Sequence, residues 1–425
     1  MSDAARSALE LAFRRLSPQL VAVLGRRVGS GRLDLAEDAV QFAMLQAART
    51  WGFHGAPDQP RAWLLRVASN RLVDLLQQQA REAPSEDAGS EESGPGTATP
   101  EPPAFADELP DDELRLLFAC CHPALSEEVQ VTLTLKVACG FSVREIALAL
   151  LADEPAVAQR LVRAKRTLRE RCAALEVPGP EELLARLCAV HQALYLLFNE
   201  GYEASEGEDL SRVELCEEAL RLVELLLAHP RTATHEGHAL AALFCFSAAR
   251  LPGRVDAEGT FIPQAARGPG AVAPELFARG ERHLRASMGE ALTALHLEAE
   301  VAFLHARSPA PEAVDWPRIL ALYDTLLALK PSPTVALNRV VALSRVRGPE
   351  AALAALAPLR SEPSLARYPW RFAVEGALRE QRGERERAAD CFRQAAALAR
   401  TPPQRAYLLA RARALAPANR PDAEG

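Results

Sequence analysis

A run of basic side chains over residues 156–172 has the composition of a helix that binds nucleic acid. Six cations and a single acid, Glu170, share this stretch with apolar residues at helical spacing. The apolar stripe predicts one buried face, so the cations are left to neutralise phosphates, and the residues near the N-terminal end are placed to meet base edges in a major groove. The DNA-contact candidates are Gln159, Arg160, Arg163, Lys165 and Arg166. A solvated basic face on an ordinary core helix is the alternative.

The sequence just before this run supplies the element that would position it. Gly140 ends one predicted helix, and Ser142 with Glu145 forms a capping box that begins the next. Asp153 and Pro155 then mark a short break and a fresh helix start. Residues 142–171 therefore predict a helix-turn-helix whose second helix carries the cations. The residues expected on its inner face are Val157, Leu161, Ala164 and Leu168.

A second polar cluster lies near the start of a predicted helix over residues 33–51. Its members, at helical spacing, are Asp34, Glu37, Asp38 and Gln41. Asp34 is the expected N-cap, and the carboxylates fall in the first turn, where they offset the helix dipole. Dipole compensation alone would account for them, so these residues by themselves leave a binding role open.

The remaining reactive patterns do not predict catalysis. Cys120, Cys121 and His122 are adjacent, and neighbours on a helix point about 100° apart, so they are poorly placed to chelate one ion. The segment NEGY at 199–202 predicts a helix break at Gly201, with its first two residues as cap and turn. No glycine-rich phosphate loop, HExxH or GxSxG motif is present. We expect no metal, no cofactor and no enzymatic activity.

Composition predicts an all-α globular protein. Of 425 residues, 49% are hydrophobic, 25% charged and only 5% aromatic, and helix formers predominate. No apolar run approaches the ~18 residues of a membrane span, and the N-terminal residues lead into an amphipathic helix, not a signal peptide. Eight cysteines without a CxxC pair argue against a disulfide framework. A cytoplasmic protein without membrane association is expected.

The net charge of −7 conceals segments of opposite sign. Residues 1–81 carry +4 and residues 114–175 carry +3, whereas residues 82–113 carry −11. Residues 82–108 are rich in Pro, Gly, Ser and Glu, which predicts a flexible acidic linker. The two basic segments keep nucleic-acid binding open although the whole chain is acidic.

Hydrophobic periodicity predicts helices on both sides of this linker. Those before it cover residues 7–28, 33–51 and 61–80, and those directly after it cover 111–122 and 127–139. The apolar positions of the second helix include Phe42 and Leu45. From residue 181 onward the pattern is one of helical hairpins.

A repeat emerges near the C-terminus. Gly348 and Gly383 are 35 residues apart, each between two apolar-periodic helices, and Ala388, Phe392 and Ala395 follow the second glycine. These offsets are similar to the 34-residue tetratricopeptide (TPR) repeat, a helix hairpin packed through small residues. Arg400 stands where proline is expected, so we predict two to three degenerate repeats.

Together these segments resemble a known family. DLAEDAVQFA and PRAWLLRVASNRLVD, then an acidic linker, then LRLLFACCHPALSEEVQVTLTLKVACGFSVREIALALL and AQRLVRAKRTLRE, resemble an extracytoplasmic-function (ECF) sigma factor of bacterial RNA polymerase. LYLLFNEGYEAS and the C-terminal repeats resemble the subgroup with a long TPR-containing extension. The resemblance covers nearly the whole chain in the expected order.

The resemblance implies roles for particular residues. Asp34, Glu37, Asp38 and Gln41 match the stretch that binds the clamp helices of core polymerase. Residues 52–60 match the loop that captures a flipped base of the −10 element, and residues 142–171 match the helix-turn-helix that reads the −35 element. The helix facing the −10 element is matched by Trp63, Arg66, Asn70, Arg71 and Asp74.

One departure from the family bears on function. After Asp74 such proteins usually carry a run of arginines, whereas this chain has LLQQQAR, with Arg81 alone. Each lost phosphate contact weakens DNA binding. The predicted function is that of a sigma factor controlled by its own extension, with core polymerase, promoter DNA and a protein or peptide ligand of the extension as partners. The alternative is a TPR scaffold with a degenerate helix-turn-helix that no longer initiates transcription.

The expected domain limits follow from these matches. Residues 1–81 are predicted as sigma region 2 and residues 109–176 as region 4, joined by the linker at 82–108. Residues 177–300 are predicted as a helical extension domain. The last segments are TPR-like repeats at 301–416 and a disordered tail at 417–425.

Overall fold

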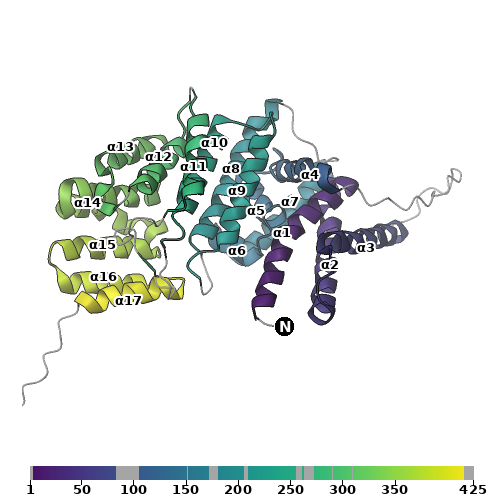
Figure 1. Ribbon diagram of the computed structural model, residues 1–425, viewed down its shortest axis with the longest axis horizontal. Helices are drawn as coiled ribbons and strands as arrows, with labels where there is room; N and C mark the ends of the chain where they lie inside the picture. The colour runs from purple at the N-terminus through teal and green to yellow at the C-terminus, as the bar shows by residue number, and fades with distance from the viewer. Residues whose placement is uncertain are drawn as a thin grey trace, which may run out of the picture. The chain divides into compact units, whose positions relative to one another are not determined.

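In a computed structural model the chain is helical throughout the part that can be described (Figure 1). That part comprises residues 3–82, 105–150, 152–171, 180–204, 209–254, 261–262, 272–289, 291–308 and 310–415. These residues contain seventeen α-helices and no strand, so the all-α prediction is confirmed. The chain divides into two compact units, Met1–Leu197 (unit 1) and Phe198–Gly425 (unit 2).

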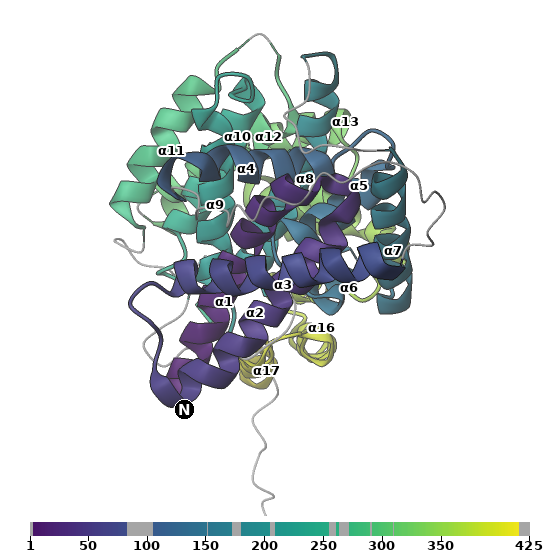
Figure 2. The same cartoon turned by 90° about the vertical axis from the view of Figure 1, so that its right-hand side faces the viewer.

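Unit 1 begins with three helices that pack on one another. They are α1 (Asp3–Val28), α2 (Leu33–His54) and α3 (Pro60–Glu82), with a short 3-10 turn, η1 (Ser30–Arg32), before α2. Figure 2 shows α3 crossing α1 and α2. Their apolar stripes meet in a core that includes Leu20, Leu24, Ala39, Leu64 and Leu72. Burial of these stripes stabilises helices that local propensity alone would leave marginal.

The second helical group of unit 1 contains the predicted helix-turn-helix. Its helices are α4 (Phe105–Cys120), α5 (Glu127–Val137), α6 (Val143–Ala149) and α7 (Glu154–Arg171). The capping box is present as predicted, because the Glu145 amide donates to Ser142 Oγ and the Ser142 amide donates to the Glu145 carboxylate. The predicted inner-face residues of α7 are all buried. Helix α4 also packs against α1, so the two groups share a contact.

Local details of unit 1 differ from the sequence-based expectations. Arg32, not Asp34, occupies the N-cap of α2, since η1 leads directly into the helix and moves Asp34 into its first turn. Helix α2 continues to His54, which shortens the predicted loop at 52–60 to residues 55–59. Glu82 belongs to α3 and residues 105–108 belong to α4, so helix extends into both ends of the predicted linker. Residues 83–104 and the predicted tail at 417–425 lie outside the described residues.

The predicted helix break falls one residue later than Gly201, at Tyr202, where α8 (Pro180–Tyr202) ends. Asn199 and Glu200 are helical, so their predicted role as cap and turn residues is wrong. The boundary between the units lies within this helix. A Cβ at Gly201 would lie 2.7 Å from the Cys216 amide nitrogen, at the start of α9 (Val213–Ala228). Glycine is therefore explained by the close approach of a second helix, not by a helix end. Glu200 is buried and pairs with Arg212 at 3.4 Å.

Unit 2 continues with α10 (His235–Ala249), α11 (Pro274–Ala286) and α12 (Ala294–Arg307). Helix α10 packs against α9, α11 and α12, and it is apolar on most sides, with buried Phe244 and Phe246. The Phe198 ring stacks on Phe244 with 4.3 Å between centroids. These aromatic contacts form the centre of this part of unit 2.

The last five helices form hairpins, and glycine makes two of their turns. They are α13 (Trp316–Leu329), α14 (Pro333–Leu356), α15 (Pro369–Gln381), α16 (Arg385–Leu398) and α17 (Pro402–Leu415), and Figure 1 shows α15, α16 and α17 side by side. Gly348 interrupts α14 with φ 82°, and Gly383 separates α15 from α16 with φ 78°, both in the left-handed region that favours glycine. Ala388, Phe392 and Ala395 are buried, at the positions that the repeat pattern predicted.

Another glycine explains how α15 and α16 pack so closely. At Gly376 a Cβ would lie 3.2 Å from the Ala388 carbonyl oxygen and 3.2 Å from the Cys391 Cβ. Gly376 was not among the predicted repeat positions, although it precedes Ala388 by the spacing that separates small residues in a helix-hairpin repeat. No helix in the described residues is long and apolar enough to cross a membrane.

Candidate DNA- and polymerase-binding surfaces

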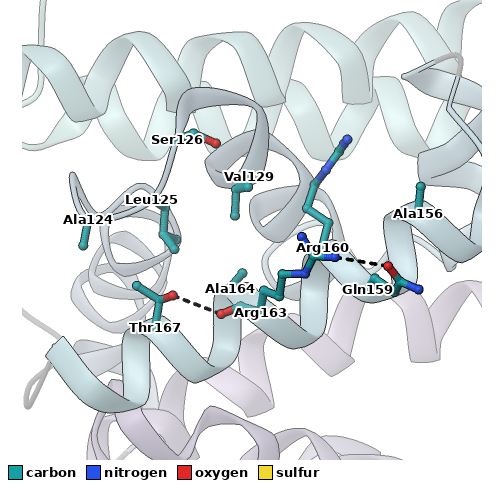
Figure 3. A pocket seen from close by; sticks show the side chains of 10 residues that line it. All are labelled: Ala124, Leu125, Ser126, Val129, Ala156, Gln159, Arg160, Arg163, Ala164 and Thr167. Carbon is teal, nitrogen blue, oxygen red and sulfur yellow. Dashed lines mark hydrogen bonds between the residues drawn. The ribbon is translucent and has the colours of Figure 1, made fainter.

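The exposed side of α7 presents the cations of the predicted recognition helix. Arg163 and Arg166 are exposed, and Arg166 makes only a long contact of 4.0 Å with Glu170. Arg163 Nη2 donates to Gln159 Oε1 at 3.2 Å, which orders the two side chains along the helix (Figure 3). Both guanidinium groups remain open to an incoming phosphate.

A cavity of about 370 Å³ separates α7 from the turn before α5. Figure 3 shows Gln159, Arg160, Arg163 and Thr167 on one side of it, and Ala124, Leu125, Ser126 and Val129 on the other. The lining combines apolar groups with two arginines and gives this helical group a concave surface beside α7.

Arg160 differs from the other candidates because it is held by α5. Its guanidinium lies 2.5 Å from Glu128 Oε1, and its Nη1 donates to Thr132 Oγ1 at 3.3 Å. The Arg160 side chain is only 19% exposed. These two contacts join α7 to α5.

The four polar residues predicted to bind polymerase divide into two pairs. Asp38 and Gln41 are exposed on α2. Glu37 is buried and pairs with Lys165 of α7. Asp34 accepts a hydrogen bond of 2.5 Å from Arg169 Nη2, and Arg169 Nε also donates to the Gly31 carbonyl at 3.2 Å. The structure thus brings two of the predicted polymerase-binding carboxylates onto the predicted DNA-binding helix.

Sequence periodicity placed Phe42 and Leu45 in the apolar stripe of α2, and this is wrong for both. Phe42 is 37% exposed and Leu45 is 59% exposed, because the core of this group is already filled by Ala39, Ala43 and Ala47. The two side chains lie on the exposed surface of α2, which also includes Asp38 and Gln41. The sequence does contain a signal for this exposure, because the apolar residues of α2 occupy more than one face of the helix and cannot all be buried.

The predicted DNA-contact residues of α3 form an exposed row, and two of them also pack against residues of α2. Arg66, Asn70 and Asp74 are exposed at spacings of four residues, on one face of the helix. Trp63 is half-buried edge-on against Trp51, with ring centroids 5.5 Å apart. The Arg71 guanidinium lies 5.2 Å from the centre of the Phe42 ring, so it links α3 to α2.

The glutamine segment after Asp74 is on the surface. Gln77, Gln78 and Arg81 are exposed, with Asp74, on one side of α3 near its end. The surface that usually carries a run of arginines is therefore present here, but amide groups provide most of it.

The cysteine pair at the end of α4 has a structural environment. Cys120 and Cys121 are fully buried, and Cys121 Sγ lies 3.4 Å from Thr134 Oγ1. Burial raises the pKa of the Cys121 thiol to about 12, so it stays protonated. His122 accepts a hydrogen bond from the Ala124 amide and organises the following turn. Within the described residues, no group of three or more potential ligands is placed to hold a metal ion.

Comparison with known proteins agrees with this arrangement. Residues 12–82 match sigma-70 region 2, residues 115–168 match sigma-70 region 4, and residues 186–288 match a family of unknown function (DUF6596). An uncharacterized protein of Rhizobium meliloti (strain 1021) is 36% identical over 421 residues, which cover 94% of each chain. The RNA polymerase sigma factor CarQ of Myxococcus xanthus is 33% identical over 178 residues, which cover 41% of this chain and 95% of CarQ. No solved structure matches.

Region 2 followed by region 4, on two helical groups of one unit, defines a bacterial transcription initiation factor. The chain belongs to the sigma-70 family of RNA polymerase sigma factors. It is an ECF-like member that carries a C-terminal extension, and the extension includes the DUF6596 segment.

Proposed function

We propose that this protein is a dissociable specificity subunit that directs core RNA polymerase to a class of −35/−10 promoters. The carrying observation is the exposed pair Arg163 and Arg166 on the second helix of a capped helix-turn-helix within region 4. In this proposal α7 binds the −35 element, the exposed row of α3 binds the −10 element, and α2 binds core polymerase.

The further assignments rest on the same resemblance. We place the protein in the ECF subfamily and in the cytoplasm, where polymerase and promoter DNA are found, and we assign it no cofactor and no catalytic activity. The hairpins of α13–α17 are TPR-like: Gly376 and Ala388 lie at the small-residue positions, and a buried phenylalanine follows at 392. A concave stack of this kind suits a protein or peptide ligand. The domain limits given above are retained as proposals.

Run-off transcription tests the main proposal. Purified chain is added to bacterial core polymerase with a pool of promoter fragments from the source genome. We expect discrete transcripts that depend on the chain and that are lost when Arg163 and Arg166 are both changed to Glu. Transcripts that persist unchanged with this variant would remove region 4 from promoter recognition.

A second candidate function is supported by the glutamine segment of α3. With only Arg81 after Asp74, region 2 has few cations near the −10 contact row, and the chain would then act as an interaction scaffold whose helix-turn-helix no longer initiates transcription. The same assay separates the two candidates. Tight binding to core polymerase without a transcript from any promoter would favour the scaffold.

We also propose that the C-terminal extension controls transcription by the sigma regions of the same chain. A minimal sigma factor needs only regions 2 and 4, whereas this chain adds a long array of packed helices after them. Passive stabilisation of region 4 is the alternative. Only control predicts that the distal repeats affect promoter-dependent transcription.

The core contacts decide where the chain should be cut for this test. Ala342 and Leu343 of α14 complete the core of α12 and α13, so a stop after residue 330 would expose that core. A stop after Leu356 keeps this cluster together with Ala351 and Ala355, which pack against it, and removes α15–α17. We expect transcription to change severalfold, while circular dichroism and proteolysis show that residues 1–171 remain folded. Equal transcription by the truncated and full chains under the same conditions would contradict control by the distal repeats.

A further inference from the structure

Helix α7 makes two ionic contacts with the start of α2, and each contact joins residues with different proposed partners. Lys165, a predicted −35 contact, pairs with Glu37, a predicted polymerase contact. One helical turn further along α7, Arg169 binds Asp34 at 2.5 Å and the Gly31 carbonyl at 3.2 Å. The members of each pair are more than 120 residues apart in the sequence, so the contact is a tertiary one.

The Lys165–Glu37 pair is the better shielded of the two. The Glu37 side chain is 10% exposed and the Lys165 side chain 27%, whereas Asp34 and Arg169 are 34% and 57% exposed. The Glu37–Lys165 pair also influences the buried Cys120 thiol, whose pKa is raised mainly by burial and further by Glu37, while Lys165 opposes the rise. The end of α4 therefore lies close to both helices. A shielded pair is less sensitive to salt than an exposed one.

The consequence for binding follows from charge. A carboxylate that is paired with α7 is not available to polymerase, and a cation that is paired with α2 is not available to a phosphate. Asp38 and Gln41 stay exposed on α2, and Arg163 and Arg166 stay exposed on α7. Each surface is therefore partly covered, and complete access to either requires that α7 leave α2.

We propose that the Lys165–Glu37 and Arg169–Asp34 pairs form a latch that holds regions 2 and 4 together in the free protein and masks both binding surfaces until polymerase or DNA displaces it. The inference rests on the proposed function, since it uses the same surfaces for polymerase and DNA. Competition is mutual: an occupant that takes the α2 carboxylates releases the α7 cations, and the reverse holds as well.

Charge-matched variants of the full chain test the latch. Glu37→Gln removes one carboxylate from the latch. Asp38→Asn removes one from the exposed side of the same helix, where no ion pair with α7 exists among the described residues. Hydrogen exchange followed by mass spectrometry reports opening without any ligand. For Glu37→Gln we expect amide exchange in α7 and in residues 30–34 to rise by about fivefold, as expected from loss of an ion pair of this burial. For Asp38→Asn we expect no change.

The second arm measures DNA binding by the free chain. Fluorescence anisotropy with a short random-sequence duplex at low salt should show several-fold tighter binding by Glu37→Gln than by Asp38→Asn, because only the first variant releases Lys165. From the other side, Lys165→Gln should bind core polymerase more tightly than wild type, whereas Arg166→Gln should not. Circular dichroism confirms that each variant is folded.

The outcomes separate the latch from the proposed function. Unchanged exchange in both Glu37→Gln and Lys165→Gln would overturn the latch. If amide exchange is faster but the variants bind DNA and polymerase as tightly as their controls, the masking is overturned, because separation of α7 from α2 would then expose no binding surface. If exchange and binding behave as expected but no promoter yields a transcript, the latch stands and the proposed function fails.

Discussion

Arg160 of α7 is bound to Glu128 of α5 at 2.5 Å, so the helix proposed to bind DNA is anchored by one of its own predicted contact residues. This relationship distinguishes Arg160 from Arg163 and Arg166, which are exposed. The three arginines should therefore respond differently to substitution, although the sequence pattern treats them alike.

We expect Arg163→Ala and Arg166→Ala each to flatten the slope of log affinity against log salt by about one unit, with an unchanged melting temperature. If the Arg160 guanidinium contacts a guanine, Arg160→Ala should reduce the binding free energy that favours this base at one position of the −35 element by roughly 1–3 kcal/mol. It should also lower the free energy of unfolding by up to about 1 kcal/mol, since α5 and α7 lose an ion pair. Salt titrations with a duplex recovered from run-off transcription measure these effects. If no substitution alters binding, α7 is not the recognition helix.

Leu45 provides a test of the polymerase surface without loss of core packing. Its side chain is 59% exposed on α2, beside the exposed Asp38 and Gln41. We expect Leu45→Ala to weaken binding to core polymerase by about tenfold, the effect of a moderate interface residue, and to leave the melting temperature unchanged. Val162→Ala truncates an apolar residue on α7 that is 70% exposed and serves as the control. Equal polymerase affinity of both variants would exclude this part of α2 from the interface.

Two glycines inside helices should differ in their tolerance of alanine. A Cβ at Gly201 would lie 2.7 Å from a backbone nitrogen, which forces α8 and α9 apart, whereas at Gly376 the nearest atoms are 3.2 Å away. Gly201→Ala should therefore lower the free energy of unfolding by about 1–3 kcal/mol. Gly376→Ala should be close to neutral, because the helix propensity of alanine, about 1 kcal/mol, offsets the crowding. Urea unfolding of the full chain compares them, and equal losses would refute the packing argument.

A chain of polar groups in unit 2 predicts loss of stability in acid. His283 Nε2 lies 2.8 Å from Glu224 and its Nδ1 lies 3.0 Å from His238 Nδ1, with Arg279 on the same carboxylate. The hydrogen bond with His283 and then Arg279 lowers the pKa of Glu224 to about 2, against the opposing effect of burial. Burial, then His283 and His235, lowers the pKa of His238 below 6.5.

The sign of the effect follows from these shifts. The unfolded chain binds a proton at His238 more readily than the folded chain, so stability falls as the pH drops below 6.5. The contribution of Glu224 is present above pH 4.5 and is lost as the pH falls toward 2. We expect His238→Gln to reduce the decline in melting temperature below pH 6.5. His229→Gln, which is outside this chain of groups, should leave it unchanged. A pH dependence that is equal in both variants would contradict the assignment.

The described cysteines should differ strongly in reactivity. Burial raises the pKa of Cys216 and Cys245 to about 12, as it does for Cys121, so their thiolates are scarce near neutral pH. Cys188 is exposed. Peptide mapping after brief treatment of the native chain with a maleimide should find Cys188 modified before these three thiols. Early modification of Cys121 would mean that α4 and α5 open more readily than their packing indicates.

Sequence reasoning succeeded where the deciding interactions are local. The Ser142–Glu145 capping box and the inner face of α7 follow from residues a few positions apart, and the turn glycines at 348 and 383 follow from a repeat along the chain. It failed for the role of Gly201 and for the burial of Phe42 and Leu45, because close approach of a second helix and prior filling of the core are tertiary effects. The pairing of Glu37 with Lys165 could not be predicted, since nothing in a sequence pattern joins residues 128 positions apart.

Helix α14 belongs to two neighbouring cores at once. Ala342 and Leu343 pack with α12 and α13, while Leu337 and Val340 pack with Leu378 and with the part of α14 that follows Gly348. In linear repeat proteins, stability depends on the interaction energy between neighbouring repeats, and here α14 provides that interaction. Unfolding of α15–α17 must also break the hydrogen bonds of Trp370 and Gln404 with Glu203. It then meets its largest barrier at α14, because melting this helix dissolves both cores together. The array should lose its last hairpins as one cooperative block before the remainder of unit 2 unfolds.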